Sequence, residues 1–62
     1  MAKTLYYIYC REESGNEFYV DIRNTRESAI DMIRTCYNRD YNLGYNKVLG
    51  QRYYFMVERS GN

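Results

Sequence analysis

KTLYYIYC, residues 3–10, is the segment from which we build the predicted sheet outward. Its residues are mostly β-branched or aromatic, as strands prefer. Successive side chains of a strand point to opposite faces, and both faces here are apolar or aromatic, which favours a central strand. Because Ile and Cys are among the most often buried residues, we expect the face with Ile8 and Cys10 to meet the core. That face carries Tyr6, Ile8 and Cys10, and the other carries Leu5, Tyr7 and Tyr9.

A second strand is predicted at residues 17–23, EFYVDIR, where apolar and polar side chains alternate. It follows a polar break at residues 11–17 with Ser14, Gly15 and Asn16 at its centre, and Gly and Asn suit the positive φ of tight turns. The two strands therefore form a β-hairpin. The inward set is Phe18, Val20 and Ile22, and the outward set is Tyr19, Asp21 and Arg23.

Residues 25–38 are predicted to form a helix. Asn24 or Thr25 suits the N-cap, and Glu27 lies three residues after Asn24, as in a capping box. The apolar residues then recur at spacings of three and four, which is the pattern of one helical stripe. This stripe consists of Ala29, Ile30, Ile33, Cys36 and Tyr37.

Residues 39–50 are predicted to form a loop, and residues 51–58 a third strand. The loop is rich in Asn and contains Gly44 and Gly50, and we expect Leu43 to tuck under the end of the helix. In the strand, the pattern favours Tyr53, Phe55 and Val57 as the core-facing set. The outward set is then Arg52, Tyr54, Met56 and Glu58.

These elements predict an α+β fold in β-β-α-β order, as a single small domain over residues 1–62. The apolar stripe of the helix needs a partner, which the hairpin supplies, so one helix covers one face of a three-stranded sheet. We place the third strand beside the first. The connection through the helix is long enough for a crossover, which makes the third strand parallel to one of the other two.

The composition argues against several classes of function. The 62 residues contain no histidine and no Gly-rich phosphate loop, and the two cysteines stand within apolar patterns. We therefore expect no enzyme, no metal and no cofactor, and two buried free thiols rather than a disulfide. No stretch resembles a signal peptide or a membrane span. These features predict a cytoplasmic protein that does not associate with a membrane.

The uncovered face of the sheet is the main candidate site. With the assignments above, it carries tyrosines and a methionine with two arginines at the rim, which are Tyr7, Tyr9, Tyr19, Tyr54, Met56, Arg23 and Arg52. An apolar patch of this kind commonly marks an interaction surface. Tyr41 and Tyr45, in the Asn-rich loop, form a second candidate surface. The alternative for the loop is that its tyrosines pack on the end of the helix.

Three interpretations of the uncovered face are open. Tyrosine is a common strand residue and packs across strands with its hydroxyl in water. Tyr, Arg and Met are also enriched in protein interfaces, which suggests a homodimer through back-to-back sheets or another protein partner. Bases of a single-stranded nucleic acid or a nucleotide stack on tyrosine rings as well. The net charge is only +1, which favours a protein over a nucleic acid.

The chain is compact, lacks catalytic residues and is rich in Tyr and Arg. This character resembles small accessory proteins of phages and mobile elements, which act by binding a host factor; the resemblance lies in composition and covers no motif. It implies a regulator or inhibitor. We therefore expect a non-enzymatic, self-associating binding protein that acts on a protein partner, with nucleic-acid or nucleotide binding as the alternative.

Overall fold

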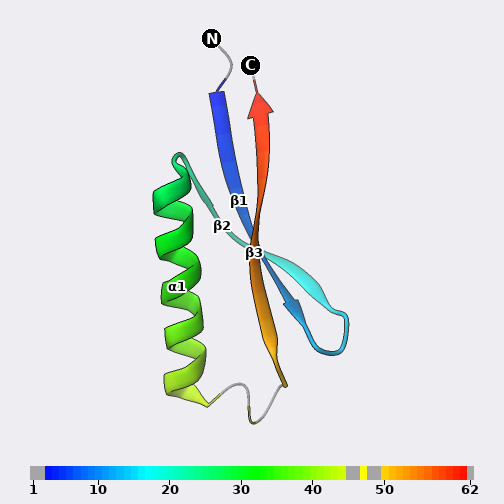
Figure 1. Cartoon of the computed structure of the whole chain (residues 1–62). Coiled ribbons are helices and arrows are strands. Elements are labelled where there is room, and N and C mark those ends of the chain that lie inside the picture. The colour runs from blue at the N-terminus through cyan, green and yellow to red at the C-terminus, as the bar shows by residue number, and fades with distance from the viewer. Residues whose placement is uncertain (1–2, 45–46, 48–49, 62) are drawn as a thin grey trace.

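The computed structural model describes residues 3–44, 47 and 50–61, and these form one sheet and one helix (Figure 1). The elements are β1 (Lys3–Glu12), β2 (Glu17–Arg23), α1 (Arg26–Leu43) and β3 (Arg52–Gly61). The predicted α+β fold with β-β-α-β order is confirmed. The first and third strands are longer than predicted, and the helix ends at Leu43 rather than near residue 38.

The sheet has the strand order β2-β1-β3, so β1 is central as predicted. β1 pairs antiparallel with both neighbours. β3 therefore runs in the same direction as β2 but is separated from it by β1. The connection through α1 passes from one edge of the sheet to the other, and α1 covers one face on the way (Figure 1).

β2 contains a β-bulge that reverses part of its predicted pattern. Tyr9 lies opposite Tyr19, whereas Ile8 lies opposite Asp21, so one extra residue, Val20, stands between them. Beyond such an insertion the alternation shifts by one residue. The outward assignment of Asp21 and Arg23 and the inward assignment of Ile22 are therefore wrong. Both polar residues lie on the helix side, and Ile22 faces away from the helix.

The faces of β3 are also opposite to the prediction. Residues directly across an antiparallel pair share a face. Cys10 lies opposite Tyr54 and Ile8 opposite Met56, so Tyr54 and Met56 face the helix. The predicted inward set of Tyr53, Phe55 and Val57 faces the other way. Both sets contain large apolar side chains, so the pattern alone did not distinguish them.

The core is small and lies between α1 and the sheet. Its buried apolar residues are Ile8, Cys10, Ala29, Cys36 and Tyr54. Val20, Met32 and Ile33 pack around the cysteines and Tyr54. The stripe predicted for the helix thus supplies Ala29, Ile33 and Cys36 to the core.

The two ends of α1 have regular caps. The side chain of Thr25 accepts a hydrogen bond from the backbone N–H of Ser28, so Thr25 rather than Asn24 is the N-cap. Gly44 ends the helix in the left-handed conformation, with φ of 73°, which glycine adopts without a steric penalty. Leu43, expected under the helix end, is 58% exposed. Within the described residues, no helix has the length and apolar character needed to cross a membrane.

The molecule is flat and elongated, measuring 45 × 21 × 10 Å between its Cα atoms. Its radius of gyration is 12.9 Å, against about 10.6 Å for a compact domain of the same length. The first residues of β1 pair only with the end of β3, so these two strands extend beyond β2 (Figure 1). Within the part of the chain that the structure describes, α1 lies on one face of this extended sheet and no element covers the other face.

Candidate functional site: the open face of the sheet

We call the sheet face opposite α1 the open face. It receives side chains from all three strands, because alternate residues of each strand point away from the helix. Its apolar members are Leu5, Tyr7, Tyr9, Tyr19, Ile22, Tyr53, Phe55 and Val57. Its charged members are Lys3, Arg11, Glu17 and Arg59. The open face is therefore apolar at its centre and charged at its ends.

Four aromatic rings of the open face form a continuous row across the three strands. Tyr19 on β2 contacts both Tyr7 and Tyr9 on β1, with ring centroids 6.4 and 6.1 Å apart. Tyr9 stacks on Phe55 of β3, with centroids 5.8 Å apart and an angle of 23° between the ring planes. Such pairs contribute about 0.5–1.5 kcal/mol beyond the burial of their area. These contacts fix the orientation of the rings before any partner binds.

Two arginines lie over the ends of this aromatic row. The guanidinium of Arg11 is 5.6 Å from the centroid of Phe55, and that of Arg59 is 5.9 Å from the centroid of Tyr7. Arg11 also forms an ion pair with Glu17, with 2.9 Å between the nitrogen and the oxygen. Both contacts hold the guanidinium of Arg11 at the edge of the face.

The open face is accessible to a partner. Tyr53 is 54% exposed and Tyr19 53% exposed, although both are large aromatic residues. Arg11, Tyr53 and Phe55 line a hollow at the end of the face near the hairpin turn. A partner side chain that entered this hollow would contact an aromatic ring and a guanidinium together.

The charges of the sheet are divided between its two faces. Glu12, Asp21 and Glu58 lie on the helix side, as their pairing with β1 and β3 requires. The open face carries Lys3, Arg11 and Arg59 against a single acid, Glu17. The open face is therefore basic, although the net charge of the whole chain is near neutral.

The structure brings together only part of the predicted site. Tyr7, Tyr9 and Tyr19 lie on the open face as predicted. The assignment of Arg23, Arg52, Tyr54 and Met56 to that face is wrong, because the β-bulge and the pairing of β3 place them on the helix side. Tyr41 lies on α1 rather than in a loop and is 80% exposed. Tyr45 lies outside the described residues.

Sequence reasoning missed several members of the open face. The faces of Tyr53, Phe55 and Val57 on β3 were exchanged in the prediction, and the bulge reversed that of Ile22 on β2. Arg11 and Arg59 lay outside the predicted strands. The charged residues of β3 gave no usable signal. Alternation assigned Arg52 and Glu58 to the outward face, but Arg52 has a buried carboxylate as its partner on the helix side.

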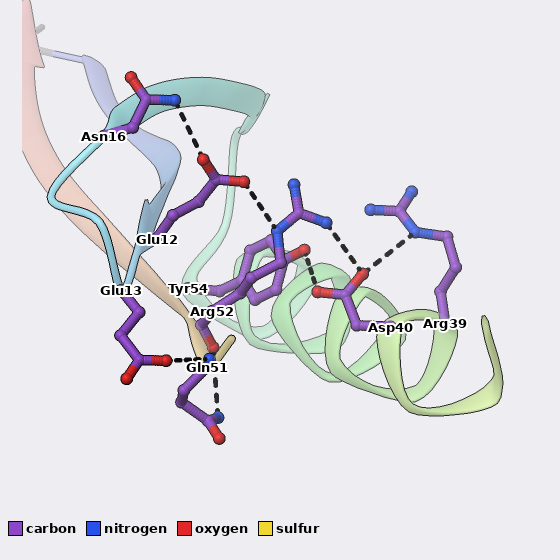
Figure 2. A network of polar contacts seen from close by, with 8 residues as sticks. All are labelled: Glu12, Glu13, Asn16, Arg39, Asp40, Gln51, Arg52 and Tyr54. Carbon is purple, nitrogen blue, oxygen red and sulfur yellow. Dashed lines mark hydrogen bonds and ion pairs between the residues drawn. The ribbon is translucent and has the colours of Figure 1, made fainter. Parts of the chain in front are cut away.

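That carboxylate is Asp40, which is only 1% exposed (Figure 2). It accepts a 2.5 Å hydrogen bond from the hydroxyl of Tyr54 and forms an ion pair with Arg52, at 3.4 Å. Arg39 lies at 3.8 Å from the same carboxylate. A buried charge is costly unless it is paired and hydrogen-bonded. These contacts therefore explain why Arg52 and Tyr54 face the helix.

The network continues to the hairpin. Arg52 lies 3.5 Å from the carboxylate of Glu12, which also accepts a hydrogen bond from Asn16 (Figure 2). The backbone N–H of Gln51 donates to Glu13, at 2.9 Å. The turn after β1, the start of β3 and the end of α1 are thus joined by polar contacts. We assign this network a structural role that fixes the start of β3 against the hairpin turn and the end of α1.

Burial changes the acidity of the groups in the core. It raises the pKa of Tyr54 well above its ordinary value, and the hydrogen bond to Asp40 adds to the effect. Burial likewise raises the pKa values of Cys10 and Cys36, both of which are free thiols. A raised pKa leaves these thiols protonated and therefore poor nucleophiles. Among the described residues, no group of His, Cys, Asp and Glu side chains is arranged to hold a metal ion.

Comparison of the chain with models of protein families, with curated proteins and with solved structures gives no match.

Proposed function

We propose that the chain is a small non-enzymatic binding protein that docks a protein partner on its open face. The observation that carries the proposal is the row of four aromatic rings on the side of the sheet away from α1, in which Tyr19 is 53% exposed and the other three rings are half-buried. An uncovered apolar patch on a small protein commonly marks an interaction surface. Tyr and Arg, which dominate this face, are also the types most enriched among residues that contribute strongly to binding.

The order already present among the rings supports this proposal. Tyr9 is held by Phe55 on one side and by Tyr19 on the other. A side chain that is held before binding loses less conformational freedom when a partner arrives, and that loss is about 0.5–1.5 kcal/mol per flexible side chain. The open face therefore resembles a preorganised binding surface more than a set of mobile solvent-facing tyrosines.

The proposed mode of action is the occlusion or recruitment of a host factor, as a regulator or inhibitor would do. It needs no catalytic group, only a stable surface. We place this action in the cytoplasm, because Cys10 and Cys36 are free and buried, as is usual in a reducing compartment.

Single-stranded nucleic acid is a second candidate for the same face, and the division of charge favours it. Lys3, Arg11 and Arg59 face the same side as the rings, whereas most acids of the sheet face the helix. Proteins that bind single strands combine stacking rings with basic groups along the backbone path. Three cations and one acid make a weaker basic surface than most such proteins have, so the protein partner remains the first proposal.

Site-specific photo-crosslinking in living cells tests the proposal and separates the two candidates. p-Benzoylphenylalanine would replace Tyr19 on the open face in one protein and Tyr41 on the helix in another, because both positions are exposed. We expect a discrete protein adduct from position 19 and none from position 41. A nucleic-acid adduct from position 19 would support the second candidate instead. The same protein adducts from both positions would contradict a specific open-face site.

A further inference from the structure

We propose that two copies of the chain pair through the outer edge of β3, which joins their sheets into one sheet of six strands. The inference comes from the backbone of β3 and from Tyr37, not from the open face. The pairing does not depend on the proposed function; only its consequence for the size of the docking surface rests on that function.

The backbone groups of β3 alternate between the side of β1 and the outer edge of the sheet. The N–H of Glu12 donates to the carbonyl of Asn16, at 2.7 Å, so Glu12 directs its backbone groups toward β2. In a strand these directions alternate, so Arg11 directs its groups toward β3, where it lies opposite Tyr53. Odd-numbered residues of β3 therefore bond to β1, and even-numbered residues direct their N–H and C=O groups to the outer edge.

Tyr54 gives independent support for this direction. Its backbone N–H donates to the hydroxyl of Tyr37, a side chain of α1, at 2.9 Å. The ring of Tyr37 also packs edge-on against the ring of Tyr54, with centroids 5.0 Å apart. Tyr37 thus covers the outer edge of β3 at this one position, as native proteins often do to prevent unwanted strand pairing.

From Met56 to Ser60 the edge is not covered in this way. Among the described residues, none accepts a hydrogen bond from the outward N–H groups of Met56, Glu58 and Ser60. The register of β3 with β1 is also unbroken from Lys3 and Gly61 to Glu12 and Arg52. The other edge strand, β2, is interrupted by its bulge at Val20. A regular and unpaired strand edge is a template for another strand.

A second copy fits this edge in one register. Two identical antiparallel strands are related by a two-fold axis, and residues that lie opposite each other must share a face. An axis at Glu58 or at Arg59 would place that charged residue against its own copy, which is unfavourable. An axis at Phe55 or at Met56 would require the N–H of Tyr54, which Tyr37 already occupies.

An axis at Val57 keeps like charges apart and leaves the N–H of Tyr54 out of the central bonds. Tyr54 then lies opposite Ser60 of the other copy, where its N–H stays bonded to Tyr37 and the pairing ends. Met56 of each copy then exchanges its two backbone hydrogen bonds with Glu58 of the other, which gives four bonds at the centre. On the open face, Val57 meets Val57 and Phe55 meets Arg59. The second of these contacts would be a cation–π pair of the type that Arg59 already makes with Tyr7.

This pairing would place both helices on one side and both open faces on the other. One open face measures about 14 × 33 Å, from the spacing and rise of its strands. Two joined faces would measure about 29 Å across the strands. The dimer would therefore supply one continuous docking surface of about twice the area.

Cysteine crosslinking tests the register. Across the axis, Val57 and its copy would form a non-hydrogen-bonded pair with Cα atoms about 4.5 Å apart, within the range of a disulfide. We expect Val57→Cys to form a covalent dimer on mild oxidation, read by non-reducing electrophoresis and intact mass. The matched control is Arg59→Cys on the same face, whose copy would lie about 13 Å away. Crosslinking of the control but not of Val57→Cys would overturn the proposal.

The oligomeric state of two further variants separates the edge from the open face. Glu58→Pro removes an outward N–H and leaves the ladder with β1 intact, so we expect light scattering to give a monomer with an unchanged circular dichroism spectrum. Tyr19→Lys changes the open face and should remain a dimer. A monomeric wild type at high micromolar concentration, or a dimeric Glu58→Pro, would overturn the proposal. A protein adduct at position 19 in a monomeric chain would leave the proposed function standing.

Discussion

Tyr53 and Tyr54 are neighbours in the sequence and lie in opposite environments. Tyr54 is 7% exposed and donates its hydroxyl to the buried Asp40, whereas Tyr53 is 54% exposed on the open face. The difference does not come from the residue type. It comes from the partner of each hydroxyl. The buried carboxylate of Asp40 needs hydrogen-bond donors from the protein, which Tyr54 supplies, whereas the exposed hydroxyl of Tyr53 can bond to water.

The removal of one hydroxyl should therefore have very different effects at the two positions. Tyr54→Phe would leave Asp40 without its closest donor, and an unsatisfied buried group costs about 1–3 kcal/mol in the free energy of unfolding. Tyr53→Phe, the matched control, should change that free energy by less than about 0.5 kcal/mol. Urea denaturation followed by circular dichroism measures both. Equal and small effects would mean that Asp40 does not depend on Tyr54.

The raised pKa of Tyr54 predicts how stability changes with pH. The ordinary tyrosine pKa is about 10, and burial together with Asp40 raises the pKa of Tyr54 in the folded chain. The unfolded chain therefore loses this proton at a lower pH than the folded chain. The contribution is complete below about pH 10 and is lost as the pH rises toward the folded pKa. Buried Cys10 and Cys36 act in the same direction, starting near their own ordinary pKa of about 8.5.

We expect the urea midpoint of the wild type to fall steeply from about pH 9 to about pH 11, because Cys and Tyr side chains of the unfolded chain lose their protons in this range. The fall should be shallower in Tyr54→Phe, which has no phenol at this position to ionise. Parallel curves for the two proteins would show that Tyr54 does not contribute to the alkaline loss of stability.

At the scale of the elements, α1 depends on contacts at its ends as much as on its stripe. The helix continues to Leu43 because Asp40, in its last turn, is held by Tyr54 and Arg52 on β3. Tertiary contacts of this kind, rather than intrinsic propensity, provide most of the stability of short helices. The polar sequence after residue 38 therefore stays helical.

The first turn of α1 offers a test of its N-cap. Thr25→Ala removes the acceptor for the N–H of Ser28 and should lower the free energy of unfolding by about 1 kcal/mol. Asn24→Ala is the matched control, since Asn24 is equally exposed but does not cap the helix, and should be nearly neutral. Thermal or urea denaturation of the two variants checks this. A larger loss in Asn24→Ala would assign the cap to Asn24 instead.

At the scale of the whole molecule, the chain has a small core and a large surface. Among the described residues, five apolar residues are buried, and the radius of gyration exceeds that of a compact domain of this length. Short chains with limited cores commonly gain stability by association. The open edge of β3 and the open face give this molecule two places where association would bury surface.

Association through β3 predicts that stability depends on protein concentration. A dimer that forms only from folded chains shifts the folding equilibrium by mass action. The urea midpoint of the wild type should therefore rise when the protein concentration is raised a hundredfold. The midpoint of Glu58→Pro should stay constant over the same range. A wild-type midpoint that is independent of concentration would exclude a stabilising dimer.

Much of this architecture could be predicted from residue patterns that act locally. The alternation in residues 17–23, the turn at Gly15 and the stripe of Ala29, Ile33 and Cys36 each indicate one element, because backbone geometry converts spacing directly into a face. The double-sided apolar character of residues 3–10 identified the central strand for the same reason. Tyr7, Tyr9 and Tyr19 were placed on the open face by these patterns alone.

The identity of the exposed face of β3 was decided only by the tertiary structure. Tyr54 and Phe55 are both suited to a core, so alternation permits either choice. The choice depends on Asp40, which is far from β3 in sequence, and on the cost of leaving its charge buried without Arg52 and Tyr54. The bulge at Val20 likewise depends on pairing with β1. Contacts between distant segments leave no periodic mark in a single sequence, which is why these features required the folded chain.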